Sequence, residues 1–257
     1  MKLHSILIAT ALAATTLCSA QNPSWIRRNA ISPDGKTIAF SYKGDIYTVP
    51  SQGGRAVQVT SNPAYESEPI WTKDSRQIVF ISYREESKDI YVVDAEGGTP
   101  KRLTFTPGNE TPLAVLPDGK VLFTFYNQNM MSDNYDGFPG QAQLYETDLD
   151  GSAPRLVTSL PIMSMSVNQD GTVLYEDYKG YEDALRKHHT SSVTRDIWKY
   201  VPATASGRFT IDGKGSFTKI CSYEGEDRNP VFADDGDTLS YLSERAGKIS
   251  NIFRNTL

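Results

Sequence analysis

The stretch that decides the fold is Ile31-Ser32-Pro33-Asp34-Gly35-Lys36-Thr37-Ile38-Ala39-Phe40, followed by Asp45-Ile46-Tyr47-Thr48-Val49, Gly53-Gly54 and Ala56-Val57-Gln58-Val59-Thr60. Asp34-Gly35 between two apolar runs predicts a hairpin turn, because Gly takes a positive φ freely and Asp hydrogen-bonds its own backbone. Gly53-Gly54 predicts another hairpin. The runs between the turns are rich in Ile, Val, Phe and Tyr, which is typical of packed strands. The unit therefore predicts four antiparallel strands, A to D.

The same unit recurs along the chain. Its second copy reads Pro69-Ile70-Trp71-Thr72-Lys73-Asp74-Ser75, Ile78-Val79-Phe80-Ile81, Asp89-Ile90-Tyr91-Val92-Val93, Gly97-Gly98 and Lys101-Arg102-Leu103-Thr104. Three further copies carry their turn aspartates at Asp118, Asp170 and Asp235. The five turn aspartates are 40, 44, 52 and 65 residues apart, and the first two intervals match one four-stranded propeller blade.

The repeat predicts an all-β fold, a β-propeller of four-stranded antiparallel blades. One such sheet cannot cover its own two faces, so blades stack around an axis. A β-sandwich with coincidental turns is the alternative. Recurrence of strand order together with turn chemistry disfavours it.

The last copy stops inside a blade. Asn251-Ile252-Phe253 aligns with Asp89-Ile90-Tyr91, the third strand of the second copy, and the sequence ends at Leu257. We therefore expect four complete blades and a truncated fifth within residues 21–257, with the first A strand at Trp25–Ser32. An unpaired blade edge promotes association, and a second copy of the chain is one partner it could take. We also expect the chain to be the front part of a longer protein.

The first 20 residues have the pattern of a secretory signal peptide. Lys2 supplies a positive start, Ile6 to Leu17 is mostly apolar, and Cys18-Ser19-Ala20 offers small residues for cleavage. The apolar run of about 12 residues is too short to span a bilayer, so we expect no membrane span after cleavage. Residues 1–20 therefore predict export, to the periplasm.

Composition limits the partners. The formal net charge is −5, whereas nucleic-acid binding requires a basic stripe, so we expect no nucleic-acid partner. After cleavage only Cys221 remains, which excludes an internal disulfide. Cys221 is expected to be a small buried side chain.

Two long insertions mark one face of the propeller. The B–C link is short at Lys43-Gly44 in the first copy but extends over Asn127–Gln141 in the third and Lys179–Arg195 in the fourth. Long loops on a rigid scaffold often carry binding residues. We expect a basic patch that contacts the carboxylate-bearing part of a peptide, or downstream domains; its residues are Arg186, Lys187, His188, His189 and Arg195. The alternative is a helix-stabilising charge pattern, with Arg195 paired to Asp196.

No catalytic or metal site is predicted. His188, His189, Ser191 and Asp196 are the residue types of a nucleophilic triad, but neighbours in one short loop rarely converge on triad geometry. Two adjacent histidines without a cysteine pair do not indicate zinc. We expect no catalytic residue, metal or other cofactor in this chain.

The sequence resembles a known family in two places. Ser32–Phe40 and Asp45-Ile46-Tyr47 are similar to TolB-type propeller repeats. More specifically, Arg186–Trp198 and Gly225–Phe232 resemble exported bacterial tricorn-protease homologues. The resemblance implies an N-terminal propeller that gates or guides peptides and unfolded proteins. A PDZ module and a serine peptidase of the carboxyl-terminal-processing type, holding the catalytic residues, would follow it.

Two other functions stay open. A TolB-like periplasmic scaffold would bind protein partners, but TolB carries an α/β domain before its propeller, and here only Gln21 to Pro23 precede the first strand. The propeller of a prolyl-oligopeptidase-type enzyme would accompany a hydrolase with a Gly-x-Ser-x-Gly elbow, which does not occur in this sequence.

Overall fold

The computed structural model of the protein describes residues 25–126, 142–180, 193–203, 209–211, 213–221, 223–233, 236–246 and 251–257. Within these ranges the regular structure consists of strands, and no helix is long and apolar enough to cross a membrane. Residues 1–20 and the insertion 127–141 fall outside them, and of the insertion 179–195 only residues 179–180 and 193–195 are described.

The strands form five blades. Blade 1 contains β1 (Arg27–Ile31), β2 (Thr37–Tyr42), β3 (Asp45–Pro50) and β4 (Val57–Gln58). Blade 2 contains β5 (Glu66–Trp71), β6 (Gln77–Ser82), β7 (Asp89–Asp94) and β8 (Lys101–Arg102). Blade 3 contains β9 (Asn109–Val115), β10 (Val121–Tyr126), β11 (Gln143–Thr147) and β12 (Arg155–Thr158). Blade 4 contains β13 (Ile162–Val167), β14 (Val173–Asp177), β15 (Ile197–Val201) and β16 (Ser216–Lys219). Blade 5 contains β17 (Asp227–Phe232), β18 (Thr238–Ser243) and β19 (Asn251–Thr256).

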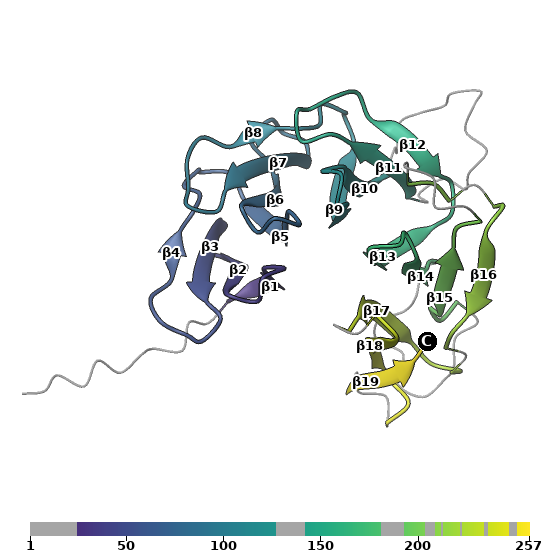
Figure 1. Cartoon of the computed structure of the whole chain (residues 1–257). Helices are drawn as coiled ribbons and strands as arrows, with labels where there is room; N and C mark the ends of the chain where they lie inside the picture. Colours follow the sequence, from purple (N-terminus) through teal and green to yellow (C-terminus); the bar gives the residue numbers. More distant parts are fainter. Residues whose placement is uncertain are drawn as a thin grey trace, which may run out of the picture.

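Each blade is an antiparallel meander in sequence order. The A strands β1, β5, β9, β13 and β17 are innermost, and the D strands β4, β8, β12 and β16 are outermost (Figure 1). The described residues of blade 5 form a three-stranded sheet. These observations confirm the predicted β-propeller, with four four-stranded blades followed by a partial fifth.

The turn aspartates of blades 1 and 2 occupy equivalent hairpins. Oδ1 of Asp34 accepts a 2.6 Å hydrogen bond from the hydroxyl of Ser32, and Oδ1 of Asp74 accepts one of the same length from Thr72. In both turns the same oxygen also accepts the backbone N–H two residues further on, at 3.1 Å. This equivalence confirms the predicted repeat.

The hydrophobic core lies between successive blades. Its four clusters centre on Ile46 with Ile78, Ile90 with Phe123, Leu144 with Tyr175, and Leu174 with Leu239. Each blade thus buries its apolar faces against its neighbours, as in other repeat architectures.

The B–C and D–A links share one end of the blades, which we call the B–C face. The backbone N–H of Glu66, where β5 begins, donates to the carbonyl of Gly44 in the B–C turn of blade 1 at 2.8 Å. The long insertions follow β10 and β14 and so also start from this face.

Candidate functional site

Arg195 is the predicted contact residue that can be located. It lies two residues before β15 on the B–C face, and its side chain is 24% exposed. Arg186, Lys187, His188 and His189 lie outside the described residues. Whether they form a basic patch stays a prediction.

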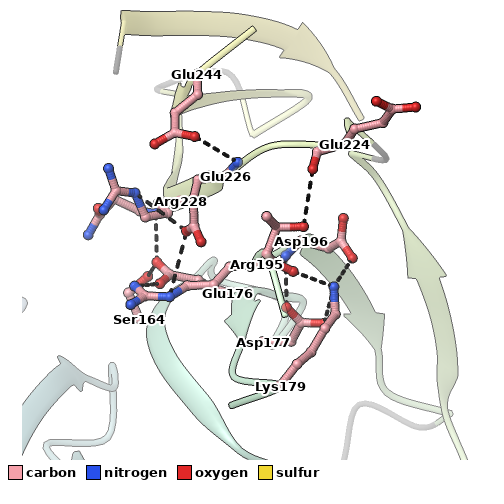
Figure 2. Close-up of polar contacts among 12 residues, drawn as sticks. Ser164, Glu176, Asp177, Lys179, Arg195, Asp196, Glu224, Glu226, Arg228 and Glu244 are labelled. Carbon is pink, nitrogen blue, oxygen red and sulfur yellow. Dashed lines mark hydrogen bonds and ion pairs between the residues drawn. The ribbon is translucent and has the colours of Figure 1, made fainter. Parts of the chain in front are cut away.

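Arg195 is bound by carboxylates of two blades (Figure 2). Its Nη1 lies 2.6 Å from Oε1 of Glu176 on β14. Its Nε lies 3.7 Å from Oε2 of Glu226, the residue before β17 in the sequence. The Glu176 side chain is 2% exposed, and its Oε2 accepts the backbone N–H of Asn229 at 2.9 Å. The cluster therefore joins blade 4 to blade 5.

The two carboxylates of this cluster stabilise the charged form of Arg195. Burial lowers the pKa of Arg195, but attraction by Glu176 and Glu226 outweighs burial and raises it. A ligand carboxylate would have to compete with Glu176 for the guanidinium.

Asp196 does not pair with Arg195, which counts against the pairing in the alternative interpretation of the charged insertion. Asp196 contacts Nζ of Lys179, and it lies 2.8 Å from Nζ of Lys219 on β16. Successive side chains in extended backbone point to opposite sides, which separates the Arg195 side chain from that of Asp196.

A second ion-pair arrangement lies at the B–C end of blade 2. Glu66, the first residue of β5, is opposite Ser82, the last residue of β6. Oε1 of Glu66 accepts hydrogen bonds from Oγ of Ser82 at 3.2 Å and from Nε and Nη2 of Arg84 at 3.0 and 2.5 Å. Glu66 is fully buried. Arg84 follows Ser82 by two residues. We call the group formed by the acid, the serine and the arginine the acid–serine–arginine clamp.

Blade 5 repeats the clamp. Asp227 is opposite Ser243, and Nη2 of Arg245 lies 3.2 and 3.0 Å from the two oxygens of Asp227. Nε of Arg245 donates to Oγ of Ser243 at 2.9 Å. This group was not predicted from the sequence, although a Ser-x-Arg motif stands at the end of strand B in both blades.

The innermost strands carry strained polar residues. Arg28, Glu68 and Asn229 have φ values of 44°, 55° and 52°, and each sits where the register between strands A and B shifts. Such bulges re-aim side chains, and positive φ in a non-glycine residue costs on the order of 1–3 kcal/mol. Nε of Arg28 lies 3.0 Å from Oε1 of Glu68, linking the bulges of blades 1 and 2.

The opposite face holds a cavity of about 1040 Å³ lined by A–B turns of all five blades. Asp34, Asp74 and Asp170 line it together with Lys73. Hydrogen bonds from Ser32 and Thr72 lower the pKa of Asp34 and Asp74, so both are charged at neutral pH. This mouth of the propeller is therefore polar and mainly acidic.

Cys221 is buried and unpaired, which confirms the prediction for it. Burial raises the pKa of its thiol, which disfavours the nucleophilic thiolate. In the part of the chain that the structure covers, no three His, Cys, Asp or Glu side chains gather as metal ligands.

Comparison with known proteins gives one family match. The model of the tricorn protease N-terminal β-propeller domain matches residues 23–257. Tricorn protease homolog 1 of Streptomyces coelicolor is 26% identical over 224 residues, which is 84% of this chain and 18% of that protein. The chain thus spans less than a fifth of this relative.

Solved structures share the fold. The tricorn protease crystal structure matches with a TM-score of 0.69 and 19% identity, over 91% of this chain and 22% of the other. TolB from Acinetobacter baumannii matches with a TM-score of 0.60 and 17% identity, over 90% of this chain and 50% of the other.

Proposed function

Because the chain belongs to the family of tricorn protease N-terminal β-propeller domains, we propose that it is the non-catalytic propeller of an exported tricorn-like serine peptidase. In this role it guides unfolded peptides toward an active site in downstream domains. Those domains and peptide substrates are its partners.

The observation that carries the guiding role is the charged pair Arg28–Glu68 on bulges of the innermost strands. A propeller core needs apolar contacts between blades, and it does not require ion pairs or positive φ values on the A strands. Strained backbone that the surrounding structure tolerates often marks a functional position. Charged side chains beside the axis can form weak, rapidly broken contacts with a polypeptide that passes through, and these contacts do not select for a particular sequence.

The test uses the longer protein that contains this propeller together with its peptidase domains. Arg28→Glu places two acids side by side at the pair, and Glu68→Arg places two cations there. We expect each change to slow cleavage of a long unfolded protein several-fold. Cleavage of a short chromogenic peptide, which diffuses to the active site directly, should be unchanged.

The matched control is Arg55→Glu, an exposed cation in the β3–β4 link of blade 1 with the same change in charge. The Arg28→Glu/Glu68→Arg double variant restores the pair with reversed polarity and should regain most of the long-substrate rate. Equal rates for the parent and both single variants on the long substrate would contradict the guiding role. Peptide turnover by the pure 257-residue chain would contradict its non-catalytic assignment.

A further inference from the structure

The clamp position can be compared across blades, since strand pairing defines it. It consists of the first residue of strand A, the strand B residue paired with it, and the residue two positions after that strand B residue in the sequence. Blades 2 and 5 have Glu66 and Asp227 in strand A, each bound by an arginine. In blade 4 the strand A position is Ile162, and the acid is the strand B residue paired with it, Asp177. Its carboxylate lies 3.6 Å from Nζ of Lys179, two residues further on.

Blade 1 has no acid at either position. Arg27 is opposite Ser41, and the residue two beyond is Lys43. The place of the carboxylate is therefore taken by a second cation. Among the described residues neither Arg27 nor Lys43 has a carboxylate partner; their recorded contacts are with aromatic rings.

The backbone holds Lys43 at this position. Lys43 and Gly44 form a two-residue hairpin loop between β2 and β3, with φ values of 52° and 93°. Two positive φ values fit the tight turn that such a hairpin prefers. Lys43 is exposed, and its Nζ lies 5.3 Å from the ring centroid of Tyr42.

The two cations share a pocket with aromatic side chains. A cavity of about 470 Å³ is lined by Arg27, Ser41, Lys43 and Gly44, and by the rings of Trp25, Tyr42 and Tyr65. The Trp25 side chain is 68% exposed, and the Arg27 guanidinium carbon lies 5.4 Å from its ring centroid. Mostly apolar walls with a few convergent charges are typical of ligand sites.

We propose that this blade 1 pocket binds a carboxylate carried next to an aromatic or aliphatic group, as in a peptide. In blades 2 and 5 the cation of the clamp is bound by an acid of the chain itself. In blade 1, Arg27 and Lys43 bind the carboxylate of the ligand instead, through charge-assisted hydrogen bonds. The rings of Trp25 and Tyr65 contact the apolar group. The peptide nature of the ligand rests on the proposed function, whereas the carboxylate site rests on the repeat comparison.

The test measures binding to the full chain by calorimetry and by Trp25 fluorescence. Hydrocinnamate and its amide are the minimal probes. The peptide probes are acetyl-Ala-Ala-Phe as free acid and as amide, and acetyl-Ala-Phe-Asp-Ala-amide with its Asn counterpart. Each acid should bind about tenfold more tightly than its neutral partner, and added salt should reduce the difference. The two peptide pairs distinguish a chain-terminal from a side-chain carboxylate.

Arg27→Glu recreates the arrangement of blades 2 and 5, so its acid should pair with Lys43 and acid binding should fall at least about tenfold. Lys43→Gln tests the second cation, and Arg55→Glu on the opposite face controls for the change in net charge. Urea unfolding midpoints verify that each variant folds.

Equal binding of hydrocinnamate and its amide, or unchanged binding by both Arg27→Glu and Lys43→Gln, overturns the carboxylate site. Arg27-dependent binding of hydrocinnamate without binding of any peptide supports the carboxylate site and counts against the guiding function.

Discussion

Nη1 of Arg195 lies 2.6 Å from Oε1 of Glu176, and the second oxygen of the same carboxylate accepts the backbone N–H of Asn229 from the next blade. Oε2 also accepts a hydrogen bond from Ser164 at 2.7 Å. One buried carboxylate therefore connects strands A and B of blade 4 with strand A of blade 5. A buried carboxylate of this kind strongly destabilises the fold when the cation that neutralises it is removed.

Replacing Arg195 with Ala should lower the free energy of unfolding by about 3–5 kcal/mol, because Glu176 is left buried without its cation. Urea unfolding at neutral pH measures this. Arg76→Ala, which removes an exposed cation, should change the value by less than about 0.5 kcal/mol. Adding Glu176→Gln to Arg195→Ala should recover much of the loss. A loss no larger for Arg195→Ala than for Arg76→Ala would contradict the role assigned to the ion pair.

Glu110 predicts a pH dependence of stability. Burial raises its pKa from 4.5 to about 7, against the opposing hydrogen bonds from Thr104 and Thr106. Since the folded pKa exceeds the unfolded one, its contribution to stability is complete below pH 4.5 and is lost as the pH rises through about 7.

Glu110→Gln should therefore gain stability relative to the parent as the pH rises across this window, by on the order of 3 kcal/mol. Urea midpoints of both proteins at a series of pH values measure the difference. Parallel curves from pH 4.5 to 8 would show that Glu110 titrates normally.

Gly215 precedes β16 at a close approach between backbone and side chain. A Cβ added there would meet the carbonyl oxygen of Val201 and lie 2.6 Å from a ring carbon of the fully buried Tyr200. Gly215→Ala should lower the free energy of unfolding by about 1–3 kcal/mol through overpacking. Ser216→Ala, the exposed neighbour, should stay within about 0.5 kcal/mol of the parent in the same thermal or urea unfolding experiment.

Export predicts a defined mature protein. We expect cleavage after Ala20, so that protein recovered from the envelope fraction starts at Gln21. Intact mass spectrometry measures the difference between this species and the full chain. Recovery of protein that still begins at Met1 would refute the signal peptide.

The repeat could be predicted because its signals are local. Asp34 hydrogen-bonds within its own turn, and so does Asp74, so the turn chemistry is written in a few adjacent residues. The buried character of Cys221 followed from general residue preferences. The alternative pairing of Arg195 with Asp196 is wrong, because adjacency in the sequence does not tell on which side of the backbone each side chain lies.

By itself, the sequence determined the blade plan and the order of strands, because turn residues and strand periodicity act over short distances. The family was indicated by the resemblance of its motifs to known proteins. Only the tertiary structure decided which charges meet. Arg195 and Glu176 are joined by strand pairing in blade 4, and Arg28 reaches Glu68 only when two blades pack side by side. Arg27 and Lys43 become recognisable as cations without an acid only once the strand register aligns them with the clamps of blades 2 and 5. These two ion pairs join positions that are 19 and 40 residues apart, which the fold, and no local pattern, brings within a few ångströms.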